Sequence, residues 1–173
     1  MASFVEYSEK IINFRLPRYE ELPSIDLYMD QLICYIETVL APLQVVQTEK
    51  PITTAMVNNY IKQGVIPSTE KKKYSKKHIA YLLVVGILKQ IYTIQEIGEL
   101  VKIQAGCFDL YTAYDYFCTE LELALKAVFT QSKLSEDTAK TSAEQKVFVR
   151  NSVIAYANKL NVQKLICYLE NGK

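Results

Sequence analysis

The lysine-rich stretch near the middle of the chain is the feature best suited to chemistry with a charged partner. The segment EKKKYSKK at 70–77 holds five lysines and one acid, Glu70. Between Lys62 and Lys89 there are seven lysines against that one glutamate, a balance of +6, so the rest of the chain has 13 basic and 18 acidic side chains, a balance of −5. A basic patch on an acidic body is the electrostatic footprint expected for binding a polyanion.

A helix with one polar face is predicted just before the lysines. Over 53–63 the apolar residues share one side at helical spacing, and the polar residues share the other. Asn58 and Asn59 on the polar side are poor helix formers, so they suggest a ligand, with ordinary solvation as the alternative. Asn and Gln pair with adenine in the major groove, and lysines neutralise phosphates. The predicted DNA-binding residues are Thr54, Ala55, Asn58, Asn59, Lys62, Gln63, Lys71, Lys72, Lys73, Tyr74, Lys76 and Lys77.

Two aromatic residues beside the lysines have alternative roles. Tyr74 would either hydrogen-bond a phosphate or anchor the loop in the core, and we favour the anchor. His78, one turn into the next helix, is expected at the surface or on a phosphate. No nucleophile or carboxylate stands beside it in the sequence, so we do not predict a catalytic role.

Residues typical of catalysis or metal binding do not form a recognisable pattern. The sequence has no paired-carboxylate, Cys/His, Ser/His or glycine-rich phosphate motif, so we predict a protein that is not an enzyme and needs no cofactor. The four cysteines lie far apart, and there is one histidine, so no metal site is predicted. We expect the cysteines to be small buried residues in a reducing compartment.

An aromatic run after residue 106 offers a second candidate site. Its rings recur at helical spacing and would either pack in the core or line a pocket for a small organic effector, with polar tyrosine tips converging in it. The residues of this effector pocket would be Phe108, Tyr111, Tyr114 and Phe117.

The elements that must position these residues are helices. We predict helices from Ser24 to Pro42, over 53–63, from Ser75 to 91, from Thr93 onward, over 107–131 and over 143–170. Thr53 or Thr54 would cap the second, Gly64 would end it in a left-handed conformation, and Thr93 with Glu96 forms a capping box. Gly86 suggests a close helix crossing, and Gly106 a break.

The predicted fold is all-α, with at most a small β-hairpin in the lysine loop. We expect a head over 1–104 and a C-terminal helical region for dimerisation or effector binding over 105–173. The chain has 173 residues, half of them apolar and 23% charged, which is typical of a globular protein. The N-terminus does not resemble a signal peptide, and the longest apolar run is too short for a membrane span, so we expect a cytoplasmic protein with no membrane partner.

Three motifs follow one another over residues 51–102: Tyr60, Gly64, Val65 and Ile66, then Tyr74 and Ser75, then Leu88, Tyr92, Thr93, Ile94, Glu96 and Ile97. Their order resembles the winged helix-turn-helix head of MerR-type regulators. Asn58 stands where that type usually has arginine, and the wing lacks the glycine and first tyrosine that build its hairpin. The opening LPRYEELP at 16–23, and the whole chain, also look similar to an uncharacterised bacterial family, domain of unknown function family 1836.

The resemblance implies a DNA-binding transcriptional regulator, with helix 53–63 in the major groove and the lysine loop 70–77 on phosphates. Metal sensing is not implied, because no metal-binding cysteines follow the head. The predicted partners are double-stranded DNA, a second copy bound through the C-terminal helices, and a small organic effector. Those helices could equally close a bundle within one chain. The alternative function is a non-catalytic interaction adaptor that kept the winged-helix fold without DNA binding.

Overall fold

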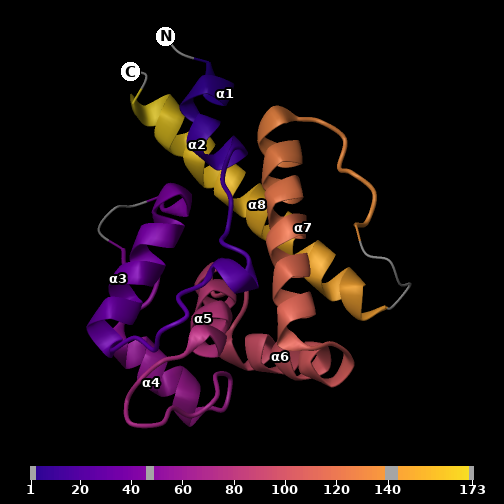
Figure 1. Cartoon of the computed structure of the whole chain (residues 1–173). Coiled ribbons are helices and arrows are strands. Elements are labelled where there is room, and N and C mark those ends of the chain that lie inside the picture. The colour runs from indigo at the N-terminus through magenta and orange to yellow at the C-terminus, as the bar shows by residue number, and fades with distance from the viewer. Residues whose placement is uncertain (1–2, 46–48, 139–143, 172–173) are drawn as a thin grey trace.

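The protein is described by a computed structural model that covers residues 3–45, 49–138 and 144–171. Over these residues the chain is helical, without a strand, which confirms the predicted all-α class (Figure 1). Two isolated antiparallel bridges join Leu27 to Tyr74 and Glu70 to Lys73. The helices are α1 Phe4–Tyr7, α2 Glu9–Ile12, α3 Met29–Leu40, α4 Thr54–Lys62, α5 Lys76–Leu88, α6 Ile94–Cys107, α7 Leu110–Thr130 and α8 Gln145–Asn171, with short 3-10 turns η1 Tyr19–Glu21 and η2 Ala41–Leu43.

Helix α5 is the centre of the molecule, between α3 and α7 (Figure 1). From Ile79 to Leu88 its sequence is apolar on all sides, and nine residues of the helix are buried, as expected for a helix enclosed by others. A Cβ added at Gly86 would lie 2.9 Å from Leu40 Cδ1 of α3. The close helix crossing predicted from Gly86 is therefore confirmed.

The two long C-terminal helices pack on each other and close the core. Helices α7 and α8 make the most extensive helix–helix contact, so much of their apolar surface is used within the chain. The buried side chains of α7 and α8 join those of α3 to α6 in one continuous core. The boundary between the regions 1–104 and 105–173 remains a prediction. Among the described residues, no helix combines the length and the apolar character needed to span a membrane.

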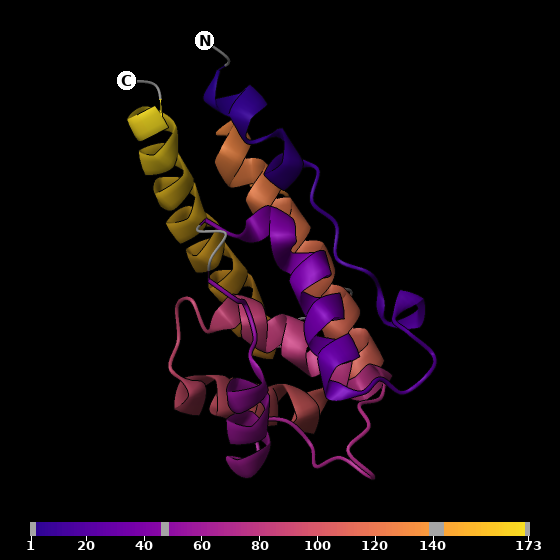
Figure 2. The same ribbon diagram turned by 90° about the vertical axis from the view of Figure 1, so that its left-hand side faces the viewer.

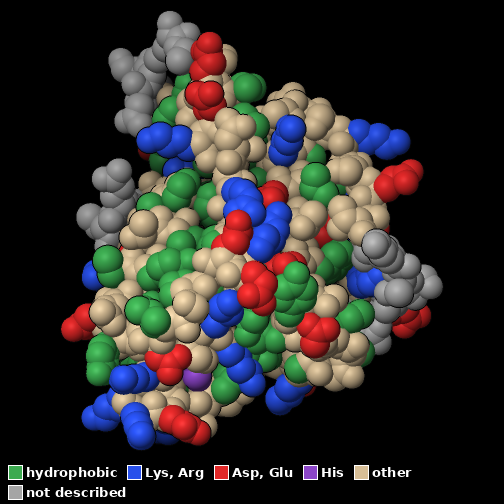
Figure 3. Space-filling model, in the orientation of Figure 1, with side chains coloured by type: hydrophobic (Ala, Val, Ile, Leu, Met, Phe, Trp, Pro, Cys, Tyr) green, Lys and Arg blue, Asp and Glu red, His purple; other side chains and the backbone are tan. Residues whose placement is uncertain are grey.

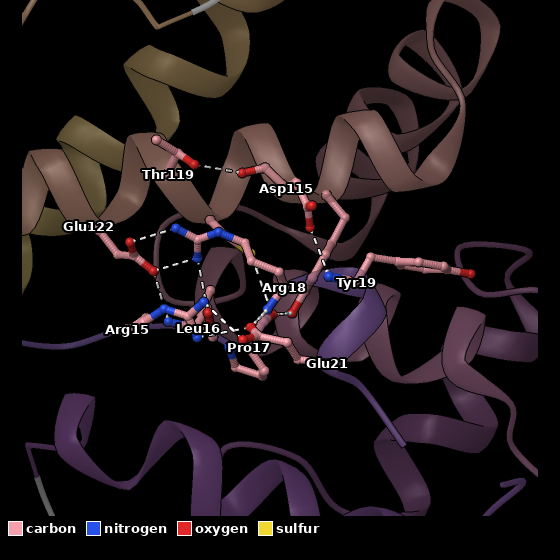
Figure 4. Close-up of polar contacts among 11 residues, drawn as sticks. Arg15, Leu16, Pro17, Arg18, Tyr19, Glu21, Asp115, Thr119 and Glu122 are labelled. Atoms are coloured by element: carbon pink, nitrogen blue, oxygen red, sulfur yellow. Dashed lines mark hydrogen bonds and ion pairs between the residues drawn. The ribbon is translucent and has the colours of Figure 1, made fainter. Parts of the chain in front are cut away.

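The segment Arg15–Glu21 straps the N-terminus to α7 (Figure 4). The Arg18 guanidinium donates to both carboxylate oxygens of Glu122, at 2.6 and 2.8 Å, and the Leu16 N–H donates to the same carboxylate at 3.0 Å. These hydrogen bonds raise the pKa of Arg18. The Tyr19 N–H donates to Asp115 at 2.8 Å, also on α7. The LPRYEELP segment therefore connects the start of the chain to a helix about a hundred residues later.

Three predicted helix ends are wrong. Helix α5 ends at Leu88 and not at 91, because the chain turns at 89–91. Helix α3 begins at Met29 and not after Ser24, because the backbone of Leu27 exchanges hydrogen bonds of 2.9 and 2.8 Å with Tyr74 and is held extended. Helix α6 continues through Gly106 to Cys107. The break follows at Asp109, whose carboxylate accepts from the Thr112 N–H at 2.9 Å and caps α7.

Candidate nucleic-acid interface

Helix α4 presents one polar face to solvent. Thr53 caps it by accepting from the Met56 N–H at 3.3 Å, which confirms one of the two predicted caps. Val57 and Tyr60 are buried on the opposite side, and burial raises the pKa of Tyr60. The six predicted residues of the polar face are all exposed: Thr54, Ala55, Asn58, Asn59, Lys62 and Gln63.

Two of these polar residues already interact. The Gln63 side chain donates to Asn59 Oδ1 at 3.0 Å, one helical turn away. That bond uses one acceptor position of Asn59, whose side chain is exposed and whose amide N–H groups make no hydrogen bond within the described residues. Asn59 therefore keeps two donors for an acceptor outside the chain, while Gln63 holds its side-chain oxygen.

Gly64 turns the chain from α4 toward the lysines. Its φ of 71° is the predicted left-handed conformation, and a Cβ there would meet nothing within 4 Å. The glycine is thus required by backbone conformation and not by space. The Val65 and Ile66 N–H groups then donate to the Tyr60 carbonyl at 3.0 and 3.3 Å, which satisfies the end of α4.

The lysine loop ends in a tight two-residue turn. The Lys73 N–H donates to the Glu70 carbonyl at 3.1 Å, and the two residues between them, Lys71 and Lys72, have φ of 51° and 56°. Positive φ at both central positions is the mark of a type I′ hairpin turn. The two lysines are consequently at the tip of a very short hairpin, with both side chains exposed.

Tyr74 and His78 anchor the hairpin to the body. Tyr74 is only 4% exposed, bridges Leu27, and lies edge-on to His78 with ring centroids 5.7 Å apart. Its burial raises its pKa and fits the anchoring role that we favoured over a phosphate contact. His78 is buried, so its expected surface position is wrong. Its Nδ1 accepts from the Ser75 N–H at 3.0 Å, which leaves Nε2 to donate to the Ser68 carbonyl at 3.2 Å.

The five lysines of segment 70–77 fall into two groups. Lys73 lies over the Tyr28 ring at 5.2 Å. Lys76 is half-buried, pairs with Glu20 at 3.2 Å and lies 5.5 Å from the centre of the Tyr19 ring. The other three, Lys71, Lys72 and Lys77, are exposed and have no ion-pair partner within the described residues.

Helix α4 and the hairpin lie at the same end of the molecule. Both are at the lower end in Figure 1 and in the view turned by 90° (Figure 2). In the space-filling view, several Lys or Arg side chains gather at the lower left edge, with acidic side chains next to them (Figure 3). The polar helix face and the three exposed lysines are therefore exposed at one end of the molecule. Neither Glu20 nor Tyr28 could be recognised from sequence as a neighbour of the lysines, because both lie about fifty residues earlier.

The predicted effector residues are only partly brought together. Phe108, Tyr114 and Phe117 line a cavity between α5, α6, α7 and α8. Tyr111 lies at the surface, edge-on to Tyr19. The Tyr114 hydroxyl donates to the Pro17 carbonyl at 2.9 Å, so the converging tyrosine tips of the effector-pocket alternative are not seen. That these residues bind an effector stays a prediction.

The cysteines are all free thiols, but only Cys118 is buried. Cys34 and Cys107 are exposed, so the expectation that the cysteines are buried is wrong for both. The part of the chain that the structure describes contains no group of three or more His, Cys, Asp or Glu side chains able to hold a metal ion.

Over the described residues, fold and surface together define an all-helical protein with a basic hairpin and an exposed polar helix at the same end. The chain belongs to the family DUF1836, described as a domain of unknown function, whose sequence profile matches residues 17–117. The match begins within the strap and ends on α7, so it includes α4 and the hairpin. No curated protein and no solved structure matches the chain.

Proposed function

We propose that this protein binds double-stranded DNA as a transcriptional regulator, through a MerR-like winged helix-turn-helix. The observation that supports this most is the exposure of the whole polar face of α4 at the same end as the lysine turn. Helix α4 would enter the major groove, and the hairpin would lie on the flanking backbone.

The lysines and the asparagines of this surface would make different kinds of contact with DNA. Lys71, Lys72 and Lys77 would neutralise phosphates, which gives affinity that depends on salt but not on sequence. Asn58 and Asn59 would read base edges, where one good bidentate pair discriminates by ~1–3 kcal/mol. Lys73 and Lys76 are held by neighbouring side chains, so we expect them to contribute less.

The proposed regulator is a homodimer that uses the outer face of α8. Val162, Leu165, Ile166 and Leu169 recur at helical spacing and remain exposed. The end of α8 also contacts α1, where Phe4 meets Tyr168 with ring centroids 5.5 Å apart. Helix-turn-helix proteins commonly dimerise to read two half-sites about one DNA turn apart. Light scattering of the wild-type protein should give twice the mass of one chain. The Ile166→Asp variant should give the mass of a single chain.

Selection from a random duplex pool tests the proposal. We expect the protein to enrich a defined sequence, and Asn59→Ala to reduce the preference for that sequence more than it reduces binding to random duplex. The control variant is Thr38→Ala, an exposed position on α3 outside the proposed DNA-binding residues, which should change neither the sequence preference nor the binding to random duplex. Failure to enrich any sequence, together with no binding to duplex, would favour the non-catalytic interaction adaptor.

A further inference from the structure

A cavity of about 310 Å³ lies between α5, α6, α7 and α8. This cavity has the volume that about ten water molecules occupy in the liquid, at ~30 Å³ each. It also falls at the lower end of the range of small-molecule sites, ~300–1,000 Å³.

The walls of the cavity are mainly apolar. Small and branched side chains from three helices face it, among them Ala80 and Val84 of α5, Val101 of α6 and Ala113 of α7. Phe117 contributes an aromatic face. Water gains few hydrogen bonds against such walls, so an apolar ligand of matching size is favoured over water.

The polar lining groups mostly have partners within the protein. Ser152 Oγ donates to the Phe148 carbonyl at 2.6 Å and pairs with the Tyr92 hydroxyl at 3.1 Å. The Asp109 carboxylate accepts from the N–H and the hydroxyl of Thr112, at 2.9 and 2.8 Å. The Ser152 hydroxyl has therefore donated its only hydrogen, and two of the acceptor positions of the exposed Asp109 carboxylate are used.

Lys77 is different from these groups. It lies in the cavity lining and is exposed, and its ammonium makes no hydrogen bond or ion pair within the described residues. We infer that the cavity binds a small amphipathic anion, whose apolar body fills the space between the helices and whose carboxylate-like head pairs with Lys77. The cavity lies apart from the face of α4, although it shares Lys77 with the proposed phosphate contacts, and ligand binding to it can be measured without DNA.

Calorimetric titration of the full chain tests this inference, with octanoate as the anionic probe, octanol as the neutral probe and octylamine as the cationic one. We expect saturable binding of one octanoate per chain, weaker binding of octanol and the weakest binding of octylamine. Lys77→Gln should weaken octanoate roughly five-fold, the effect of about 1 kcal/mol from one exposed ion pair, and leave octanol unchanged. The control Lys126→Gln removes an exposed lysine that does not line the cavity and should change neither.

Filling the cavity gives a second, independent test. Val84→Phe places a ring in the space and should reduce octanoate binding at least ten-fold, and Ala113→Phe does the same from α7 if the first variant fails to fold. Ala155→Phe adds the same ring at an exposed position of α8 and should leave binding unchanged. Absence of octanoate binding to the wild type, or undiminished binding in a folded filled variant, would overturn the site. An unchanged affinity in Lys77→Gln would overturn the anionic ligand.

Discussion

The hairpin turn leads to a prediction in which stability and binding change in opposite directions. Lys71 and Lys72 both have left-handed backbone conformations, which cost a residue with a side chain about 1–2 kcal/mol each. Asn-Gly is the pair best suited to a type I′ turn. Replacing Lys71 by Asn and Lys72 by Gly should therefore relieve backbone strain at the tip.

The expected gain follows from two opposing terms. Relief of strain is offset in part by the extra freedom of glycine in the unfolded chain, roughly 0.5–1 kcal/mol. We expect the free energy of unfolding to rise by about 1 kcal/mol, which raises the Tm by about 2–4 °C for a chain of this size. Urea unfolding followed by far-UV circular dichroism should show a higher midpoint with an unchanged m-value.

The matched control is Lys71→Gln with Lys72→Gln. It removes the same two charges but keeps side chains that are strained at positive φ, so it separates conformation from charge. Both double variants should bind duplex DNA more weakly than wild type, and by the same factor, because the phosphate contacts depend on charge. The reasoning would be refuted if the Asn-Gly variant were no more stable than the Gln-Gln variant.

Three further predictions concern the fold that holds the interface. Arg18→Ala should lower the free energy of unfolding by about 2–3 kcal/mol, which is less than for a fully buried ion pair because the Arg18 and Glu122 side chains are each about a quarter exposed. Arg18→Lys should not restore the stability, and urea unfolding of both variants measures this. Gly86→Val should cost about 1–3 kcal/mol, since its side chain would meet Leu40, and Gly98→Val, with only one contact at 3.4 Å, should cost less in the same assay. The hydrogen bonds from Thr93 hold the pKa of Glu96 below its value in the unfolded chain. The Glu96 carboxylate therefore stabilises the fold above the unfolded pKa of ~4.3, and this contribution is lost as the pH falls through the folded pKa. In Glu96→Gln, the free energy of unfolding should depend less steeply on pH in the acid range.

Features set by neighbouring residues were predictable from sequence. The capping box of Thr93 and Glu96, the cap at Thr53 and the left-handed Gly64 depend on residues within a few positions of each other. The exposure of the polar face of α4 follows from helical periodicity alone. Gly86 marked a crossing, but the sequence did not identify α3 as its partner.

Features that depend on distant residues were not predictable. The first turn of the predicted helix after Ser24 is lost because Leu27 pairs with Tyr74, 47 positions later. His78 was expected at the surface, yet it links the Ser68 carbonyl to the start of α5. The hydroxyl of Tyr114 faces the strap and not the cavity, since its partner is the Pro17 carbonyl. No pattern of neighbouring residues in the sequence predicts any of these pairings.

The central claim, that the lysine turn lies on a nucleic-acid backbone, is tested most directly by the salt dependence of duplex binding. Fluorescence anisotropy titrations at several salt concentrations give the slope of log affinity against log salt. Lys71→Ala, Lys72→Ala and Lys73→Ala together should reduce that slope by about 2, at ~0.9 for each phosphate contact of Lys71 and Lys72, because Lys73 is held over the Tyr28 ring and contributes less. The charge-matched control, with Lys10, Lys126 and Lys133 replaced by Ala, should retain the wild-type slope. Equal slopes for the two triple variants, or a wild-type affinity that does not depend on salt, would contradict the claim.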